Sequence, residues 1–286
     1  MKLSKLAVAV FASTALPVMA TAITTDIIAV VDESGSMSGE HAWLGGMISS
    51  LDTALAAAAG VDPFSAQYGL VGFGGASTHL SGHGHSVGGG DLGTAAEFNT
   101  AAGGLVLNGG TEDGYSGIDT ALGYTTQANS IRNLILVTDE DRDTLSGSAL
   151  SYASIAADLA SDNALLNAVI NSSIFCGDNT AALGMDSTGT GYQADGAGGF
   201  TTCASAYGSV NNSWNDYGLL ALGTGGAVWD LNKLRAGGTT ADSFTAAFVN
   251  IKVKETITRN VPEPGSLGLL GLGLASLAWG RKKAKA

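Results

Sequence analysis

The chain has 286 residues, 45% of them hydrophobic, and a net charge of −12 at pH 7. This length suits one large α/β domain or two small ones, and we favour one. The negative charge argues against a nucleic-acid partner, because the phosphate backbone demands a positive surface.

The N-terminus has the order of features that is typical of a secretory signal peptide. Lys2 and Lys5 come first, an apolar run follows over residues 6–18, and small residues stand at 20–22. The apolar run is too short to cross a bilayer comfortably. We therefore predict cleavage after Ala22 and export of the rest of the chain.

After this segment, apolar runs alternate with helical patterns, which predicts an α/β fold: a doubly wound, mainly parallel central sheet flanked by helices. The run at 26–31 is typical of a central strand buried on both faces. Further strands are expected at 67–75, 133–140, 164–173 and 225–231. Helices are expected over 44–59, after residue 111, over 148–160 and over 241–249, and a loop or hairpin over 77–91. The alternating stretch 250–259 predicts an edge strand or an extended stalk.

A long Gly-, Ser- and Thr-rich stretch with no helical period interrupts this alternation. We expect a loop insertion at about 174–213. The chain's two cysteines, Cys176 and Cys203, lie within it. In an exported protein two cysteines most simply form one disulfide, and this bond would hold the two parts of the insertion together.

Oxygen-bearing residues follow three of the predicted elements. Asp32, Ser34 and Ser36 come after the first strand, Thr111 lies in a glycine-rich loop before a helix, and Asp139 ends a later strand. Ligands of open α/β sheets bind at this carboxyl edge. Two carboxylates and three hydroxyls form a hard ligand set that suits Mg²⁺ or Mn²⁺. The first motif alone could equally be a helix cap.

These five residues resemble the metal-ion-dependent adhesion site (MIDAS) of the von Willebrand factor type A (VWA) domain. That pattern is D-x-S-x-S, then a distal Thr and a distal Asp, and the resemblance spans roughly residues 25–249. It implies that Ser34, Ser36 and Thr111 bind the metal directly, and that Asp32 and Asp139 bind it directly or through water. It also implies cell adhesion, through a cation that keeps one position open for a partner's carboxylate. The alternative is a structural or assembly protein in which the metal only stabilises the fold.

The sequence departs from the family pattern after Asp139, where the family often has Thr-Asp-Gly. The acidic run continues through Glu140, Asp141 and Asp143. Asp141 and Asp143 could bind a second cation such as Ca²⁺, but their spacing lacks the Gly and the final Glu of an EF-hand loop. A solvated acidic loop is the competing interpretation, and we favour it.

Two other features bear on chemistry. His83 and His85 could chelate a transition metal, but the segment offers no carboxylate or cysteine partner, which favours a solvated loop. The sequence contains no nucleophile elbow, P-loop, dinucleotide-binding glycine pattern or HExxH motif. We therefore predict a binding protein and not an enzyme.

The C-terminus joins Pro262, Glu263 and Pro264 to an apolar run at 267–279 and a basic end, which would stay on the cytoplasmic side. This order resembles the PEP-CTERM sorting signal of Gram-negative bacteria. The resemblance implies export, transient inner-membrane anchoring, removal of the tail by an exosortase, and a place in the biofilm matrix.

The predicted organisation has five parts, which are a signal peptide (1–22), a VWA domain (23–255), a linker (256–264), a transmembrane sorting helix (265–280) and a basic cytoplasmic tail (281–286). Loss of both ends removes six of the 13 basic residues and none of the 25 acidic ones, which changes the net charge to −18. Divalent cations and a solvated matrix are the partners that such a surface favours.

Overall fold

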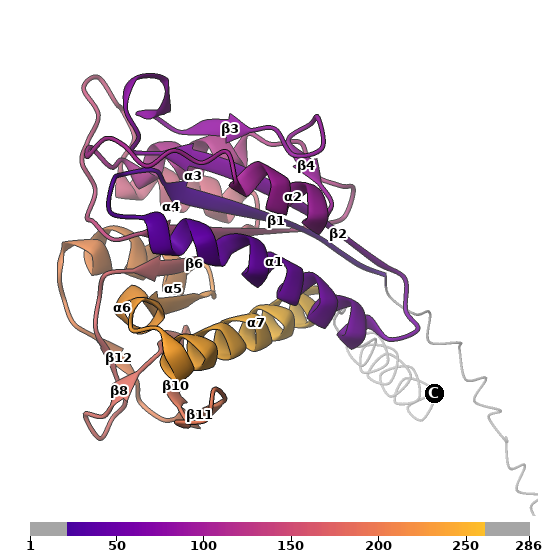
Figure 1. The fold of residues 1–286 in the computed structure, drawn as a ribbon, viewed down its shortest axis with the longest axis vertical. Coiled ribbons are helices and arrows are strands. Elements are labelled where there is room, and N and C mark those ends of the chain that lie inside the picture. Colours follow the sequence, from indigo (N-terminus) through magenta and orange to yellow (C-terminus); the bar gives the residue numbers. More distant parts are fainter. Residues whose placement is uncertain (1–21, 261–286) are drawn as a thin grey trace, which may run out of the picture.

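The computed structural model describes residues 22–260 and shows a central sheet between two layers of helices (Figure 1). Its centre consists of parallel strands in the order β13-β6-β5-β1-β2. Their bounds are β1 Ile23–Asp32, β2 Phe64–Phe73, β5 Ile131–Thr138, β6 Leu165–Ile170 and β13 Ala227–Asp230. The predicted doubly wound, mainly parallel α/β fold is confirmed.

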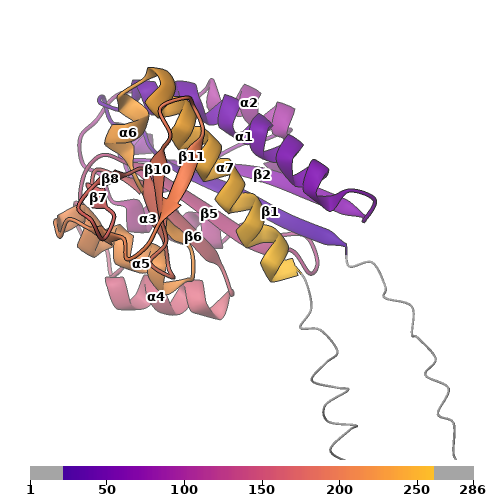
Figure 2. The ribbon, with the colours of Figure 1, turned by 90° about the horizontal axis from the view of Figure 1, so that it is seen from below.

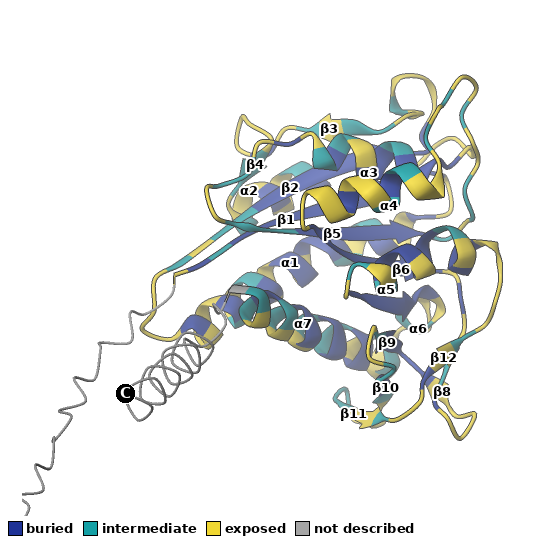
Figure 3. Ribbon diagram, turned by 180° about the vertical axis from the view of Figure 1, so that it is seen from behind, coloured by how far each residue is buried: buried dark blue, intermediate teal, exposed yellow. Residues whose placement is uncertain are grey.

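Strand β1 is buried on both faces, as its continuous apolar run predicts. Successive side chains of a strand point to opposite faces, so Ile27, Ala29 and Val31 join one hydrophobic cluster while Ile28 and Val30 join the other. Figure 3 shows the central strands as buried, with the exposed residues on the outer faces of the helices and on the loops. The register places Val31 opposite Val137 of β5 and Asp32 opposite Phe73 of β2, so these strands end together.

The helices divide between the two faces (Figure 2). One face carries α1 (Ser38–Ala59), α2 (Ala95–Ala102), α6 (Leu231–Arg235) and α7 (Gly238–Asn260). The other carries α3 (Gly114–Leu122), α4 (Tyr152–Ser161), α5 (Leu219–Gly223) and the helical turn η2 (Trp214–Gly218). Beside β2, a 3₁₀ turn η1 (Ser77–His79) leads to the short antiparallel strands β3 (His83–His85) and β4 (Leu92–Gly93).

The expected loop insertion contains short β-strands. β9 (Gly184–Asp186), β10 (Gly191–Ala194) and β11 (Phe200–Cys203) extend the main sheet beyond β13, in the order β13-β9-β10-β11, and each pairs antiparallel with the strand before it. β7 (Ile174–Phe175), β8 (Ala181–Ala182) and β12 (Tyr207–Gly208) form a separate small sheet. The predicted disulfide between Cys176 and Cys203 is confirmed, with the two Cα atoms 5.9 Å apart.

The edge strand or stalk predicted at 250–259 is wrong, because these residues belong to helix α7. The buried residues Phe244, Ala247, Phe248 and Ile251 follow helical spacing and face the core. Lys252 is also buried, and its Nζ lies 3.3 Å from Glu255 Oε2. Because this buried residue is charged, the helical spacing of the buried positions is not evident from the sequence. The predicted linker therefore starts inside this helix.

Within residues 22–260, no helix is both long and apolar enough to cross a membrane. Residues 1–21 of the predicted signal peptide (1–22), the Pro262-Glu263-Pro264 motif, the predicted sorting helix and the basic tail lie outside the described residues.

Candidate metal centre

The candidate site lies where the strand order of the sheet reverses. From β1 the chain continues to β2 on one side, whereas β5, β6 and β13 follow on the other side. Ligands of doubly wound folds bind at the carboxyl ends of strands at such a switch point. Asp32 ends β1 and Thr138 ends β5, so the predicted residues Asp32 and Asp139 are both at this position.

The Asp32 carboxylate is fully buried and held in place by two hydrogen bonds. Its Oδ1 accepts from the Ser34 backbone N–H at 2.7 Å, and its Oδ2 accepts from the Thr138 hydroxyl at 2.8 Å. Burial raises the pKa of Asp32 to about 6, and the nearby Asp139 charge adds to the increase, although both hydrogen bonds oppose it. A bound cation would offset the free-energy cost of burying the charged Asp32 carboxylate.

Hydrogen bonds join four of the five predicted residues into one cluster. The Ser34 and Ser36 hydroxyl oxygens lie 3.1 Å apart, and the Ser36 hydroxyl donates to Asp139 Oδ1 at 3.0 Å. Ser36 is exposed whereas Asp32 is buried, so the cluster runs from the protein interior to solvent. We name Asp32, Ser34, Ser36 and Asp139 the oxygen cluster.

Thr111 is exposed, and no hydrogen bond among residues 22–260 ties its side chain to the oxygen cluster. Its neighbour Glu112 is buried there, and a hydrogen bond with Ser34 links it to the cluster. Burial raises the pKa of Glu112 to about 7, and the charges of Asp32, Glu140 and Asp143 contribute further. Sequence reasoning missed this carboxylate, although it adjoins the predicted Thr111.

One cationic side chain of the protein also reaches the cluster. Arg235 Nη2 lies 2.9 Å from Asp139 Oδ2, and the same guanidinium pairs with the buried Glu40, with Nε 2.6 Å from Oε1. One arginine thus faces Glu40 and Asp139, while the buried Asp32 and Glu112 have no cationic partner within residues 22–260. The excess of negative charge, the two raised pKa values and the all-oxygen donors fit Mg²⁺ or Mn²⁺.

The acidic run after Asp139 is anchored by its one basic residue. The Arg142 guanidinium makes two hydrogen bonds to the fully buried Asp113 carboxylate, at 2.7 Å and 3.2 Å, and lies over the Tyr115 ring. Asp113 directly precedes α3 and follows Glu112. This ion pair therefore fixes the loop that carries Asp139 to the loop that carries Thr111.

The two residues of the predicted second cation site, Asp141 and Asp143, have different hydrogen-bond partners in the structure. Asp141 accepts a hydrogen bond from Asn212 at 2.9 Å, whereas Asp143 is exposed and bonds through its backbone N–H to the Glu112 carbonyl. The two carboxylates therefore have different surroundings. A cavity of about 460 Å³ adjoins the acidic run and is lined by Asp139, Glu140, Asp141, Asn171, Asn211, Asn212 and Ser213.

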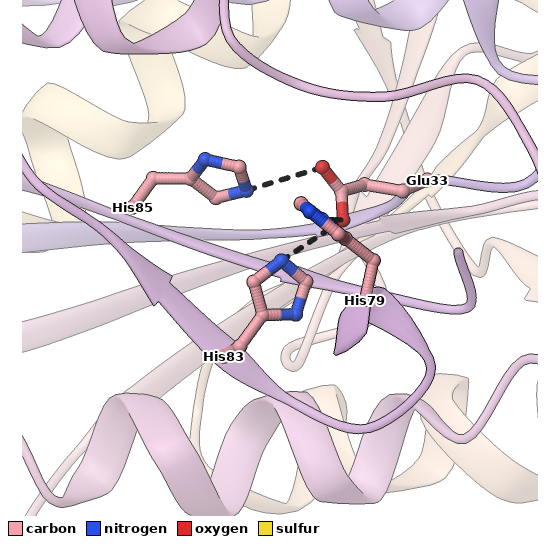
Figure 4. A group of neighbouring side chains, drawn as sticks. All are labelled: Glu33, His79, His83 and His85. Carbon is pink, nitrogen blue, oxygen red and sulfur yellow. Dashed lines mark hydrogen bonds and ion pairs between the residues drawn. The ribbon is translucent and has the colours of Figure 1, made fainter. Parts of the chain in front are cut away.

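A second cluster lies next to the first, because Glu33 directly follows Asp32. Figure 4 shows the side chains of His79, His83 and His85 converging on the Glu33 carboxylate. The nearest nitrogens are His79 Nδ1, His83 Nε2 and His85 Nε2, at 2.8, 3.0 and 3.1 Å from carboxylate oxygens. The solvated loop favoured for His83 and His85 is thus wrong, since the carboxylate missing from their segment is that of Glu33, which directly follows β1.

Glu33 is fully buried within this second cluster. Burial alone would raise the pKa of Glu33, but hydrogen bonds from His85, the Val106 backbone N–H and His79 outweigh it and hold the pKa below its ordinary value. The charged carboxylate is therefore the form that this pocket stabilises.

Comparison with known proteins confirms the sorting signal. Residues 260–282 match the PEP-CTERM protein-sorting motif, which is the recognition signal for exosortase processing. No curated protein matches the chain.

Among solved structures, the chain is similar to a von Willebrand factor type A protein from Catenulispora acidiphila, with 20% identity and a TM-score of 0.36. It is also similar to proximal thread matrix protein 1 from the mussel byssus, with 17% identity and a TM-score of 0.35. Each similarity covers 51% of this chain, and 33% and 35% of the respective other chain. The chain thus spans about a third of the length of those proteins.

Proposed function

We propose that this chain is an exported adhesion module whose oxygen cluster, together with Thr111, binds Mg²⁺ or Mn²⁺ and through it an acidic group of a matrix or protein partner. The observation that carries the proposal is the hydrogen-bonded chain from the buried Asp32 through Ser34 and Ser36 to Asp139. It supplies several hard oxygen donors at the switch point of the sheet. The proposed role is binding without catalysis.

The charge around the site supports a metal-dependent mode of binding. The adjoining cavity is lined by Asp139, Glu140 and Asp141, which repel an approaching carboxylate. A divalent cation in the oxygen cluster would neutralise Asp32 and Glu112 and offer an open coordination position at the exposed end near Ser36. A carboxylate partner would then bind only in the presence of the cation.

The sorting signal supports a site of action outside the cytoplasm. We propose that a signal peptide starts export, that the tail anchors the protein in the inner membrane, and that an exosortase then removes the tail. The oxygen cluster would work in the periplasm, at the cell surface or in the extracellular matrix.

One observation favours the alternative in which the cation only stabilises the fold. Arg235 already pairs with Asp139, which ties α6 to the end of β5 without any partner. If the cation completes this internal network, its removal should lower stability without releasing a ligand.

Binding to extracellular matrix separates these two functions. The full chain is expected to bind matrix from its own host in Mg²⁺ and to be released by a chelator, and Asp32→Asn should bind at least about tenfold more weakly, because the buried metal ligand is lost. The control is Asp62→Asn, which removes an exposed carboxylate near the opposite end of the strands. Chelator-resistant binding by Asp32→Asn would reject the adhesion proposal.

The raised pKa values predict that cation binding strengthens as the pH rises. Protons compete with the cation for Asp32, with a pKa of about 6, and for Glu112, with a pKa of about 7. Without metal, the raised pKa values mean that the folded state binds protons at these two groups more tightly than the unfolded chain does. Their contribution to the free energy of unfolding therefore increases as the pH falls through 7 and 6, and it is lost as the pH rises again. The Mg²⁺-induced rise in Tm should therefore be larger at pH 8 than at pH 5.

Thermal unfolding with and without Mg²⁺ at both pH values measures this effect. The double variant Asp32→Asn, Glu112→Gln should show the same small response at pH 5 and pH 8. An equal Mg²⁺ response of the unmodified protein at the two pH values would contradict the prediction.

A further inference from the structure

The cluster of Glu33, His79, His83 and His85 is assembled from segments far apart in sequence, and we call it the histidine cluster. Glu33 follows β1, His79 ends the turn η1, and His83 and His85 lie on one face of β3 because they are two residues apart in a strand. One ligand atom from each residue lies within 4.8 Å of all the others. A tetrahedral ion with bonds of about 2.0–2.1 Å spaces its ligands roughly 3.4 Å apart, so small side-chain movements suffice.

The hydrogen bonds of His83 leave one nitrogen without a partner. Its Nδ1 lies 2.9 Å from the Ser81 carbonyl oxygen, which can only accept, so Nδ1 carries the hydrogen. In the neutral ring Nε2 then has a lone pair. This atom is buried without a hydrogen-bond partner, although Glu33 Oε2 is only 3.0 Å away. Two adjacent acceptors repel each other unless a proton or a metal cation lies between them.

This arrangement is the one that metal-binding histidines use. Their second ring N–H commonly donates to a backbone carbonyl or a carboxylate, which fixes the tautomer and aims the lone pair at the metal. The Ser81 carbonyl does this for His83. Glu33 is similarly oriented by the Val106 backbone N–H, at 2.9 Å from Oε1.

The neighbouring backbone leaves room for the cluster. Gly72 of β2 pairs with His83 of β3, and a Cβ atom at Gly72 would lie 2.6 Å from Glu33 Oε2 and 2.8 Å from His85 Nε2. Any side chain at residue 72 would therefore intrude between the ligands.

We infer that the histidine cluster is a second metal site, which takes a first-row transition cation such as Zn²⁺. Imidazole nitrogens suit Zn²⁺, Cu²⁺, Ni²⁺ and Fe²⁺, whereas Mg²⁺ and Ca²⁺ prefer oxygen ligands. A bound cation would replace the hydrogens that His79 Nδ1 and His85 Nε2 donate to Glu33, and the three neutral imidazoles and the carboxylate would then supply four donors of the kind that zinc binds. The two neighbouring clusters thus select different metals.

A cation in the histidine cluster would also stabilise the arrangement of the neighbouring oxygen cluster. Glu33 contacts the loop before α3 twice, since its Oε1 accepts from Val106 and its backbone carbonyl accepts from Asn108 at 2.9 Å. The same loop continues to Thr111 and Glu112. The metal would fix the end of β1, the β3 hairpin and this loop to one another.

Zn²⁺ titration of the full chain, stripped of metal and followed by calorimetry at neutral pH, tests the proposal. One Zn²⁺ should bind per chain, and excess Mg²⁺ should not displace it. His83→Gln is expected to lower the Zn²⁺ affinity by at least about 100-fold, because loss of an outer-shell partner alone costs 10–100-fold. Gly72→Ala should also weaken binding while keeping all four ligands.

The control is His41→Gln, which removes the one histidine of the sequence outside the cluster. It should bind Zn²⁺ like the unmodified protein. X-ray absorption of the Zn²⁺-loaded unmodified chain gives a readout that needs no variant, and it should show imidazole ligation. Absence of a bound Zn²⁺, a zinc shell without imidazole, or unchanged affinity in His83→Gln would overturn the inference and leave a hydrogen-bonded network only.

Discussion

Replacing Asp113 by Ala is expected to lower the free energy of unfolding by about 3–5 kcal/mol, because it breaks a buried ion pair by removing one partner. Asp113 is fully buried, and the Arg142 side chain is only 11% exposed. The substitution leaves the guanidinium without its two hydrogen bonds while it stays packed over Tyr115. Chemical denaturation followed by circular dichroism measures the loss.

Asp119→Ala is the matched control, since it removes an exposed carboxylate from helix α3, which Asp113 directly precedes, and should change stability by less than about 0.5 kcal/mol. The double variant Asp113→Leu, Arg142→Leu should be less destabilised than Asp113→Ala, because no unpaired charge is left buried. If Asp113→Ala were as stable as Asp119→Ala, the ion pair would not anchor the acidic loop.

Replacing Cys176 and Cys203 together by Ser is expected to cost roughly 3–4 kcal/mol. The disulfide joins residues 27 positions apart and restricts the unfolded chain, which in the chain-entropy model stabilises the folded state by this amount. It also connects β11 of the main sheet to the end of β7 in the small sheet. Denaturation curves of the double variant and of the unmodified protein measure the difference.

The oxidised protein should show no alkylated cysteine in an intact-mass measurement without reductant. Reductant should destabilise the unmodified protein and leave the double Ser variant unchanged, which separates loss of the bond from loss of side-chain packing. Equal denaturation midpoints for the oxidised and reduced protein would contradict the prediction.

Strand β1 shows what a local pattern can predict. Its unbroken apolar run required burial on both faces, and the carboxylate that follows it then had to lie at the carboxyl edge of the sheet. The connection of Asp32, Ser34 and Ser36 to Asp139 follows from β1 and β5 ending side by side. These features depend on residues close in sequence or on the order of parallel strands.

Other features depend on contacts that spacing does not reveal. Glu33 meets His79 across 46 positions, so a search for metal ligands near His83 and His85 could not find it. The strands of the insertion are two to four residues long, too short for a period to emerge. In α7 the buried Lys252 disrupts the apolar spacing, and the alternating residues around it resemble a strand.

The most direct measurement is a crystal structure of the protein grown with Mn²⁺, with the ion located by its anomalous scattering. We expect an anomalous peak within bonding distance of the Ser34 and Ser36 hydroxyls, with Asp32 and Asp139 bound directly or through water and Thr111 completing the site. The same experiment on Asp32→Asn should show no peak there. An oxygen cluster without Mn²⁺ in the unmodified protein at saturating concentration would contradict the proposed function.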